Sequence, residues 1–108
     1  MELREYADAR GRSPFATWFN ALDERAAAKI TVALARLGLG NTSRVKGVGR
    51  GLLELKVDFG LGYRVYFARD GGEIVLLLGG GTKQRQQRDI ETAVERWQDY
   101  KNRKKRGD

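Results

Sequence analysis

The chain has 108 residues, of which 21 are basic and 14 acidic, giving a formal net charge of +7. This length fits one domain, since compact domains usually have roughly 100–150 residues. The sequence contains no cysteine and no histidine. Disulfides, thiolate nucleophiles, cysteine-ligated metal sites and imidazole catalysis are therefore excluded. Any catalysis must use Lys, Arg, Tyr, carboxylates, amides or hydroxyls.

The excess of basic residues favours a polyanionic partner such as nucleic acid. The longest aliphatic run, Ile74 to Leu78, is far shorter than the ~20 residues that span a bilayer. Charged residues near the start, Glu2, Arg4, Glu5 and Asp8, do not fit a signal peptide. We therefore expect a cytoplasmic protein with no membrane partner.

The first third of the chain predicts a short strand and two helices. Residues 2–6 alternate in polarity, as in an edge strand. Ser13 and Pro14 predict the start of a helix whose apolar stripe comprises Phe15, Trp18, Phe19 and Leu22. Asp23 predicts the cap of a second helix, which ends near Leu37 and Gly38 and buries Ala26, Ile30, Ala33, Leu34 and Leu37. Two short helices in series indicate a helical hairpin.

Residues 40–51 are rich in glycine and predict a solvated loop. The loop carries Arg44, Lys46 and Arg50 and no acidic residue. These three cations either contact phosphate or serve only solubility, because exposed charges are common on any surface.

The middle of the chain predicts three antiparallel strands. Residues 53–59 and 63–68 alternate between apolar and polar side chains, and residues 74–78 are apolar throughout. Glycine-containing turns separate them, and such short connections fit only antiparallel neighbours. The apolar strand should be an interior strand covered by the helices on one side.

The last quarter predicts a helix with a basic surface. Gly79 to Gly81 end the third strand, and Thr82 is the expected cap of a helix that buries Ile90, Ala93, Val94 and Trp97. The basic run from Lys101 to Arg106 predicts a frayed tail. We therefore predict an α/β (α+β) domain over residues 1–100, with a helical hairpin on a mostly antiparallel sheet of three or four strands, followed by a tail over residues 101–108.

Four polar side chains should project from one side of the two central strands: Glu54, Lys56, Arg64 and Tyr66. An RNA phosphodiester can be cleaved without metal or cofactor when its own 2′-hydroxyl attacks the phosphorus. The protein then orients the strand, stabilises the phosphorane and moves two protons. The alternative is that these residues form exposed cross-strand ion pairs.

Lys83, Arg85 and Arg88 place three cations at the start of the last helix, where they suit phosphate or base edges or form a solvated face. Gly79 to Lys83 also combine flexible backbone with a helix N-terminus, which attracts phosphate. The spacing is not that of a nucleotide-binding P-loop, and the glycines could equally ease a tight turn.

These residues resemble the RelE/ParE toxin superfamily, and in particular its phage-derived, HigB-like branch of addiction-module killer proteins. The resemblance covers almost the whole chain, and its segments match in order and spacing. They are residues 15–19, 51–67, 74–78, 79–83 and 87–90 with Ala93.

The resemblance implies a small toxin held inactive by a helix-turn-helix antitoxin, through which it reaches operator DNA. Many relatives cut mRNA on the translating ribosome without a cofactor. Lys56, Arg64 and Lys83 stand where RelE-like enzymes keep basic residues near the scissile phosphate. The implied roles are proton acceptor or phosphate contact for Lys56, stabiliser of the phosphorane for Arg64, and phosphate clamp for Lys83 or Arg85. Further RNA contacts are expected from Glu54, Tyr66, Arg85, Arg88, Arg44, Lys46 and Arg50.

Three features depart from the family pattern. Ile90 occupies the position at which RelE has a tyrosine that stacks on the substrate. Glu54 occupies the position at which RelE has a second strand lysine. The histidines that are common in HigB enzymes are absent. Tyr66 either replaces the missing aromatic or packs over its neighbours. Two other functions therefore stay open: a ParE-like toxin that binds gyrase, and a nonenzymatic nucleic-acid-binding module. For the nuclease, we expect alanine variants of Lys56, Arg64 and Lys83 to fold but lose toxicity.

Overall fold

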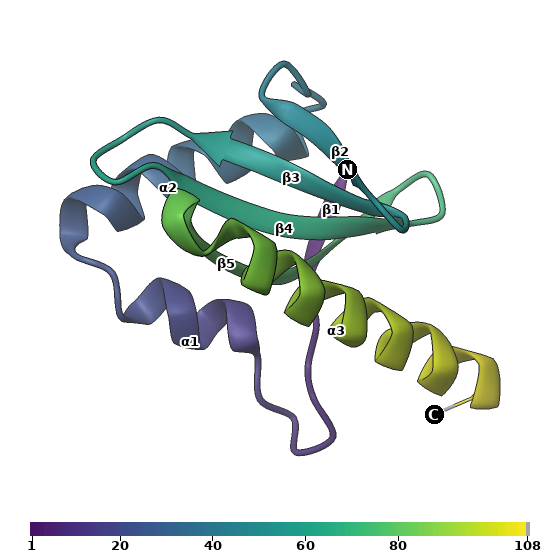
Figure 1. Cartoon of the computed structure of the whole chain (residues 1–108). Helices are drawn as coiled ribbons and strands as arrows, with labels where there is room; N and C mark the ends of the chain where they lie inside the picture. The colour runs from purple at the N-terminus through teal and green to yellow at the C-terminus, as the bar shows by residue number, and fades with distance from the viewer. Residues whose placement is uncertain (108) are drawn as a thin grey trace.

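The computed structural model describes residues 1–107 as a five-stranded sheet between helices (Figure 1). In chain order the elements are β1 (Glu2–Glu5), α1 (Pro14–Asn20), α2 (Glu24–Gly38), β2 (Val45–Gly49), β3 (Leu52–Val57), β4 (Tyr63–Asp70), β5 (Ile74–Thr82), the 3₁₀ helix η1 (Lys83–Arg85) and α3 (Gln86–Arg106). The strand order is β1-β5-β4-β3-β2. All neighbours are antiparallel except β1 and β5, which are parallel.

Helices cover both faces of the sheet, so the domain has three layers (Figure 1). On one face, α1 packs against β5 and α2 against β3, and the buried side chains there include Phe15, Ile30, Val65 and Phe67. On the other face, α3 crosses β4 and β5 and covers Leu52, Tyr66, Leu76 and Leu78. β5 is an interior strand as predicted, but the prediction of helices on one side only is wrong, because its alternate side chains face two separate cores.

Both predicted caps of the first two helices are confirmed. The Ser13 hydroxyl accepts a hydrogen bond from the backbone N–H of Ala16 at 3.0 Å, and Asp23 accepts one from Ala26 at 2.9 Å. Each satisfies an N–H that the first helical turn leaves without a partner.

The predicted loop at residues 40–51 contains an additional strand, β2, and the sheet therefore has five strands rather than three or four. Val45 and Val48 are partly buried and pack on the two opposite cores. These apolar contacts stabilise the pairing of this glycine-rich segment with β3. The two N-terminal helices follow one another as predicted, but the sheet is the main packing partner of each.

The basic segment from Lys101 to Arg106 is helical and not frayed. Cations in the last turn interact favourably with the negative end of the helix dipole, and Gly107 ends the helix in the left-handed conformation with φ of 82°. At the other end, Thr82 belongs to β5 and its side chain does not cap the helix. No helix among residues 1–107 is both long and apolar enough to cross a membrane.

Candidate functional site

Glu54, Lys56, Arg64 and Tyr66 lie on the same side of the sheet, as predicted. In the antiparallel register of β3 and β4, Lys56 is the direct partner of Arg64, and Glu54 is the partner of Tyr66. On the other side of β3, Lys46 of β2 is opposite Glu54. Side chains that are directly opposite in such a pair lie within contact distance of each other.

The structure brings Lys83 to the same place. Its backbone N–H donates to the carbonyl of Gly62 at 2.9 Å, in the turn before β4. A Cβ atom on Gly62 would lie 3.6 Å from both Arg64 Nη1 and Lys83 Cβ, so the two side chains flank this glycine. Lys56, Arg64 and Lys83 line two adjoining hollows, one of which also includes Arg44 and Lys46. We call these five residues the cationic surface: Arg44, Lys46, Lys56, Arg64 and Lys83.

Arg64 forms a buried ion pair at the base of this surface. Its Nε lies 2.5 Å from Glu54 Oε1, and the two residues are only 6% and 2% exposed. Gln86 at the start of α3 donates to both carboxylate oxygens of Glu54, at 3.0 and 3.1 Å. Nothing in the sequence marked Gln86 as this partner, because the contact depends on where α3 crosses the sheet.

The ion pair changes the roles available to both residues. The predicted alternative was a set of exposed cross-strand ion pairs, whereas the pair that forms is buried and diagonal, since Glu54 is directly opposite Tyr66. The Glu54 carboxylate contacts Arg64 and Gln86, so it holds the guanidinium in place. Arg64 also donates from Nη1 to the carbonyl of Tyr63 at 3.1 Å, which further fixes its position.

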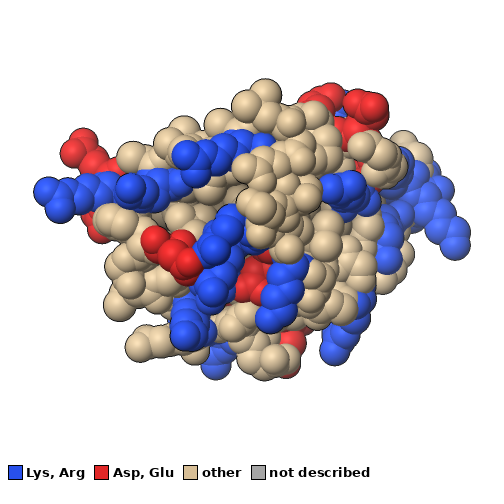
Figure 2. Space-filling view, turned by 90° about the horizontal axis from the view of Figure 1, so that it is seen from above, with Lys and Arg blue, Asp and Glu red and all other residues tan. Residues whose placement is uncertain are grey.

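The lysines of the cationic surface are exposed. Lys46 and Lys83 make no ion pair within residues 1–107, whereas Lys56 Nζ lies 3.8 Å from Asp58 Oδ1. Asp58 also pairs with Arg44, whose backbone carbonyl accepts from the Lys56 N–H at 3.0 Å. Exposed ion pairs of this kind contribute roughly 0–1 kcal/mol, so a polyanion can displace them. Figure 2, in which the molecule is seen from above, shows Lys and Arg side chains spread across that face, with a few acidic groups among them.

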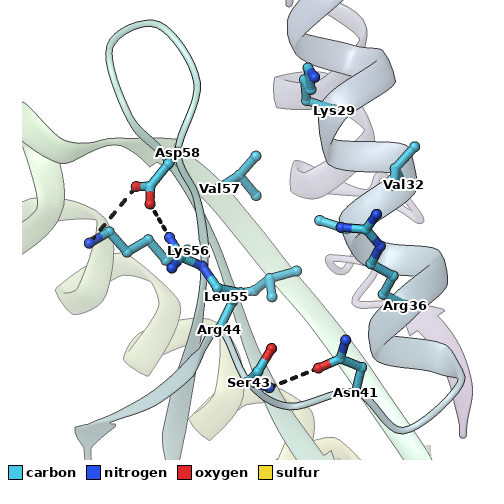
Figure 3. Close-up of a pocket in the computed structure, with 11 residues that line it drawn as sticks. Lys29, Val32, Arg36, Asn41, Ser43, Arg44, Leu55, Lys56, Val57 and Asp58 are labelled. Atoms are coloured by element: carbon cyan, nitrogen blue, oxygen red, sulfur yellow. Dashed lines mark hydrogen bonds and ion pairs between the residues drawn. The ribbon is translucent and has the colours of Figure 1, made fainter.

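A groove of about 460 Å³ lies between α2 and β3, and its lining residues on β3 and just after it include Lys56 and Asp58 (Figure 3). Leu55 and Val57 point toward α2 and form its apolar floor, together with Val32, which is 49% exposed. Three cations that line the groove lie on α2 and the following loop: Lys29, Arg36 and Arg44.

The other predicted RNA contacts lie elsewhere. Tyr66 is 1% exposed beneath α3, so the packing interpretation is confirmed and its ring is not free to stack on a base. Arg85 and Arg88 line a separate pocket on the α1 side of α3. Arg50 is exposed in the turn between β2 and β3, at the opposite end of that hairpin from Arg44.

Gly79 to Gly81 lie within β5 and do not form a turn that ends it. Both interpretations of these glycines, a phosphate-binding loop and a tight turn, assumed that the strand ends before them, and that assumption is wrong. Within residues 1–107, no group of three Asp, Glu, His or Cys side chains is placed to bind a metal ion.

Comparison with known proteins gives two matches. An uncharacterized protein of Haemophilus influenzae is 44% identical over 80 residues, which are 73% of this chain and 81% of that relative. The model of the phage-derived Gp49-like proteins (DUF891) matches residues 17–98, which include β3, β4, β5 and most of α3. That family is RelE-like and associated with toxin–antitoxin systems. The chain therefore belongs to the phage-derived Gp49-like protein family.

Proposed function

We propose that the protein is the toxin of a type II toxin–antitoxin pair, of the HigB-like branch, and that it cleaves mRNA on the ribosome in the cytoplasm without a metal or cofactor. The observation that supports this most is the grouping of Lys56, Arg64 and Lys83 on one sheet surface, in a chain of a toxin-associated family. These cations come from three different elements, so the fold assembles them.

In the proposed reaction the 2′-hydroxyl oxygen forms a bond to the adjacent phosphorus, and the bond from phosphorus to the 5′ oxygen breaks. The products are a 2′,3′-cyclic phosphate and a 5′-hydroxyl end. Arg64, held by Glu54, which accepts hydrogen bonds from Gln86, stabilises the extra negative charge of the phosphorane. A guanidinium that is already oriented needs no rearrangement as that charge develops.

The two exposed lysines have the remaining roles in this proposal. Lys83 contacts the phosphate beside Arg64, and Lys56 in its uncharged form accepts the 2′-hydroxyl proton or, when charged, binds the phosphate. Solvent within the ribosomal complex supplies the proton of the leaving oxygen. A pH–rate profile separates the two roles of Lys56, because only a base must lose its proton before the reaction.

The test is induction of the protein in a bacterial host, followed by mapping of mRNA 5′ ends before and after induction. We expect new 5′-hydroxyl ends within coding regions. Lys56→Ala and Lys83→Ala should abolish both cleavage and growth arrest, whereas Lys105→Ala, an exposed cation at the far end of α3, should retain both. Growth arrest with intact transcripts and an induced DNA-damage response would instead favour a gyrase-directed toxin.

A nonenzymatic nucleic-acid-binding module is the second candidate, and the buried Glu54–Arg64 pair favours it. Because Glu54 already neutralises Arg64, the pair can serve the fold alone while the exposed lysines bind phosphate. In that case RNA would bind with a strong salt dependence, ribosomal mRNA would stay intact, and the lysine variants would change affinity only.

We also propose that the antitoxin places an acidic, partly apolar segment in the groove between α2 and β3. The apolar floor at Leu55 and Val57 and the cations Lys29, Arg36 and Arg44 complement such a segment (Figure 3). Arg44 and Lys56 line both this groove and the cationic surface, so an occupant would reach that surface. A Lys29→Glu, Arg36→Glu variant should keep its toxicity but escape neutralisation by the antitoxin. Unchanged neutralisation would place the interface elsewhere.

A further inference from the structure

A second polar pocket lies on the other side of α3 from the cationic surface. It has a volume of about 220 Å³ and is formed between α1, the strands β4 and β5, and α3. We call it the glycine-strand pocket, and its lining residues are Pro14, Trp18, Tyr66, Gly79, Gly80, Arg85, Arg88, Asp89, Thr92 and Arg96.

The three glycines of β5 allow side chains to lie directly on the strand. A Cβ atom would collide with the Arg96 guanidinium at Gly79, with the Trp18 ring at Gly80, and with the Asp89 carboxylate at Gly81. Glycine within a strand commonly marks such close approaches. The glycine run therefore lets the Trp18 indole lie directly on one face of β5, and the Asp89 carboxylate and the Arg96 guanidinium on the other.

Within residues 1–107, two buried polar atoms of the residues around this pocket have no hydrogen-bond partner, and one of them, Asp89 Oδ2, lies over Gly81 at the edge of the lining. The hydroxyl of Tyr66 and Oδ2 of Asp89 are buried and make no hydrogen bond within residues 1–107. A buried unsatisfied group of this kind costs free energy, and native proteins contain few of them. Both residues line the pocket, so a ligand there can supply the missing partners.

The pocket also has arginine side chains that are not neutralised by its carboxylate. Arg85 and Arg88 are exposed at its mouth, whereas Arg96 is partly buried and donates to the carbonyl of Leu78 at 2.8 Å. Within the part of the chain that the structure describes, none of the three forms an ion pair with Asp89. Guanidinium groups bind phosphate oxygens through paired hydrogen bonds.

We infer that the glycine-strand pocket binds one nucleotide, with its base directed inward and its phosphate at the mouth. A base presents both N–H donors and ring or carbonyl acceptors, so it can donate to Asp89 and accept from the Tyr66 hydroxyl, beside the Trp18 ring. Its phosphate then meets Arg85 and Arg88. Inorganic phosphate alone would satisfy the arginines but not the carboxylate. This inference does not depend on RNA cleavage, since the pocket shares no residue with Lys56, Arg64 or Lys83.

The test uses Trp18 as a reporter. The chain has two tryptophans, so Trp97→Phe leaves Trp18 alone, next to the pocket. The variant is titrated with the four ribonucleoside monophosphates, ribose 5-phosphate and inorganic phosphate, and the tryptophan fluorescence is recorded. We expect a saturable change with at least one nucleotide, at concentrations at least tenfold below those needed for ribose 5-phosphate or phosphate.

Variants in the same background assign the contacts. Tyr66→Phe removes only the unpartnered hydroxyl and should weaken nucleotide binding about tenfold while the protein stays folded. Asp89→Asn should change the preference among bases, and Arg88→Ala should weaken every nucleotide. Lys105→Ala, a cation on the same helix, should have no effect. Two outcomes would overturn the inference. In the first, phosphate binds as tightly as the nucleotides and Tyr66→Phe does not change the affinity for either. In the second, none of the probes shows saturable binding.

Discussion

The two ends of α3 differ in whether the buried polar atoms beneath them have partners. Toward the C-terminal end, Tyr6 donates to Asp99 at 2.6 Å and Tyr100 donates to Asp70 at 2.5 Å. Lys104 also donates to Asp70, at 2.6 and 2.7 Å. At the N-terminal end, by contrast, the equivalent groups of Tyr66 and Asp89 make no hydrogen bond within residues 1–107.

We therefore expect residues near the C-terminal end of α3 to contribute mainly to the stability of the fold, and residues near its N-terminal end to be available for binding. Tyrosine–aspartate hydrogen bonds at the C-terminal end fix α3 on the sheet. Within residues 1–107, the N-terminal end has two buried polar atoms without a hydrogen bond, and such atoms are uncommon in native proteins. The exception is the Glu54–Arg64 pair, which is both buried and part of the candidate site.

The largest expected effect comes from breaking that pair. Arg64→Ala leaves the Glu54 carboxylate buried with only Gln86, and should reduce the free energy of unfolding by about 3–5 kcal/mol. Lys56→Ala, the cross-strand partner, should change it by less than about 0.5 kcal/mol because Lys56 is exposed. Urea denaturation of the two variants measures both changes in the free energy of unfolding.

The buried Glu54–Arg64 pair also changes one expectation from the sequence, namely that alanine variants of Lys56, Arg64 and Lys83 all fold normally. Loss of toxicity in Arg64→Ala indicates a catalytic role only if the free energy of unfolding of the variant shows that it is still folded. Equal stability of the Arg64 and Lys56 variants would mean that the buried pair contributes little to the fold.

Much of the fold could be predicted from periodicity and caps. The apolar stripes of α1 and α3, the Ser13 and Asp23 caps and the antiparallel β3–β4–β5 arrangement all depend on residues close in sequence. β2 was missed because its two apolar residues pack on opposite faces among glycines, which hides the alternation. The helical state of residues 101–106 was missed because a run of charges is typical of a tail when the dipole contribution is not considered.

The candidate site was predictable only in part. Strand alternation predicted from the sequence that Lys56 and Arg64 project from the same side of the sheet, whereas the register that makes them direct partners comes from the structure. The burial of Tyr66, the contact of Gln86 with Glu54 and the glycine-strand pocket all depend on the path of α3 over the sheet, which no local pattern specifies. A signal was present in the three consecutive glycines, which can mark close approach of side chains as well as a turn.

The two ends of α3 can be compared directly with tyrosine variants. Tyr100→Phe should lower the free energy of unfolding by about 1 kcal/mol, because Asp70 loses a hydrogen bond. Tyr66→Phe should leave stability unchanged or slightly higher, since the lost hydroxyl is buried without a partner. Thermal or urea unfolding of both variants provides the comparison, and a larger loss in Tyr66→Phe would contradict the account of the two ends.

The pH dependence of stability should have opposite signs at Asp89 and Asp70. Burial raises the pKa of Asp89, so its ionisation costs stability as the pH rises through that pKa. Hydrogen bonds from Lys104 and Tyr100 lower the pKa of Asp70, so its contribution is present above the ordinary aspartate pKa and is lost as the pH falls.

The measurement is a series of urea midpoints between acidic and neutral pH. With rising pH, Asp89→Asn should gain stability relative to the natural sequence, whereas Asp70→Asn should lose it. Parallel curves for the two variants would show that burial at Asp89 does not disfavour its charge.

The smallest effect on stability is expected at Asp58, which pairs with Arg44 and Lys56 on the surface. Asp58→Ala should change the free energy of unfolding by less than about 0.5 kcal/mol. Because it removes a negative charge beside Lys56, it should tighten binding of single-stranded RNA a few-fold at low salt, measured by filter binding or fluorescence anisotropy. Weaker RNA binding would indicate that Asp58 itself positions the cations.

We propose above all that the cationic surface makes the ribose hydroxyl of an mRNA cleave its own strand. This can be measured with purified protein and ribosomes programmed with an mRNA that carries a single 2′-deoxyribose at the mapped cut. We expect cleavage at that position to disappear, while the all-ribose mRNA yields a 2′,3′-cyclic phosphate and a 5′-hydroxyl end. Cleavage of the 2′-deoxy substrate at an undiminished rate would rule out attack by the 2′-hydroxyl.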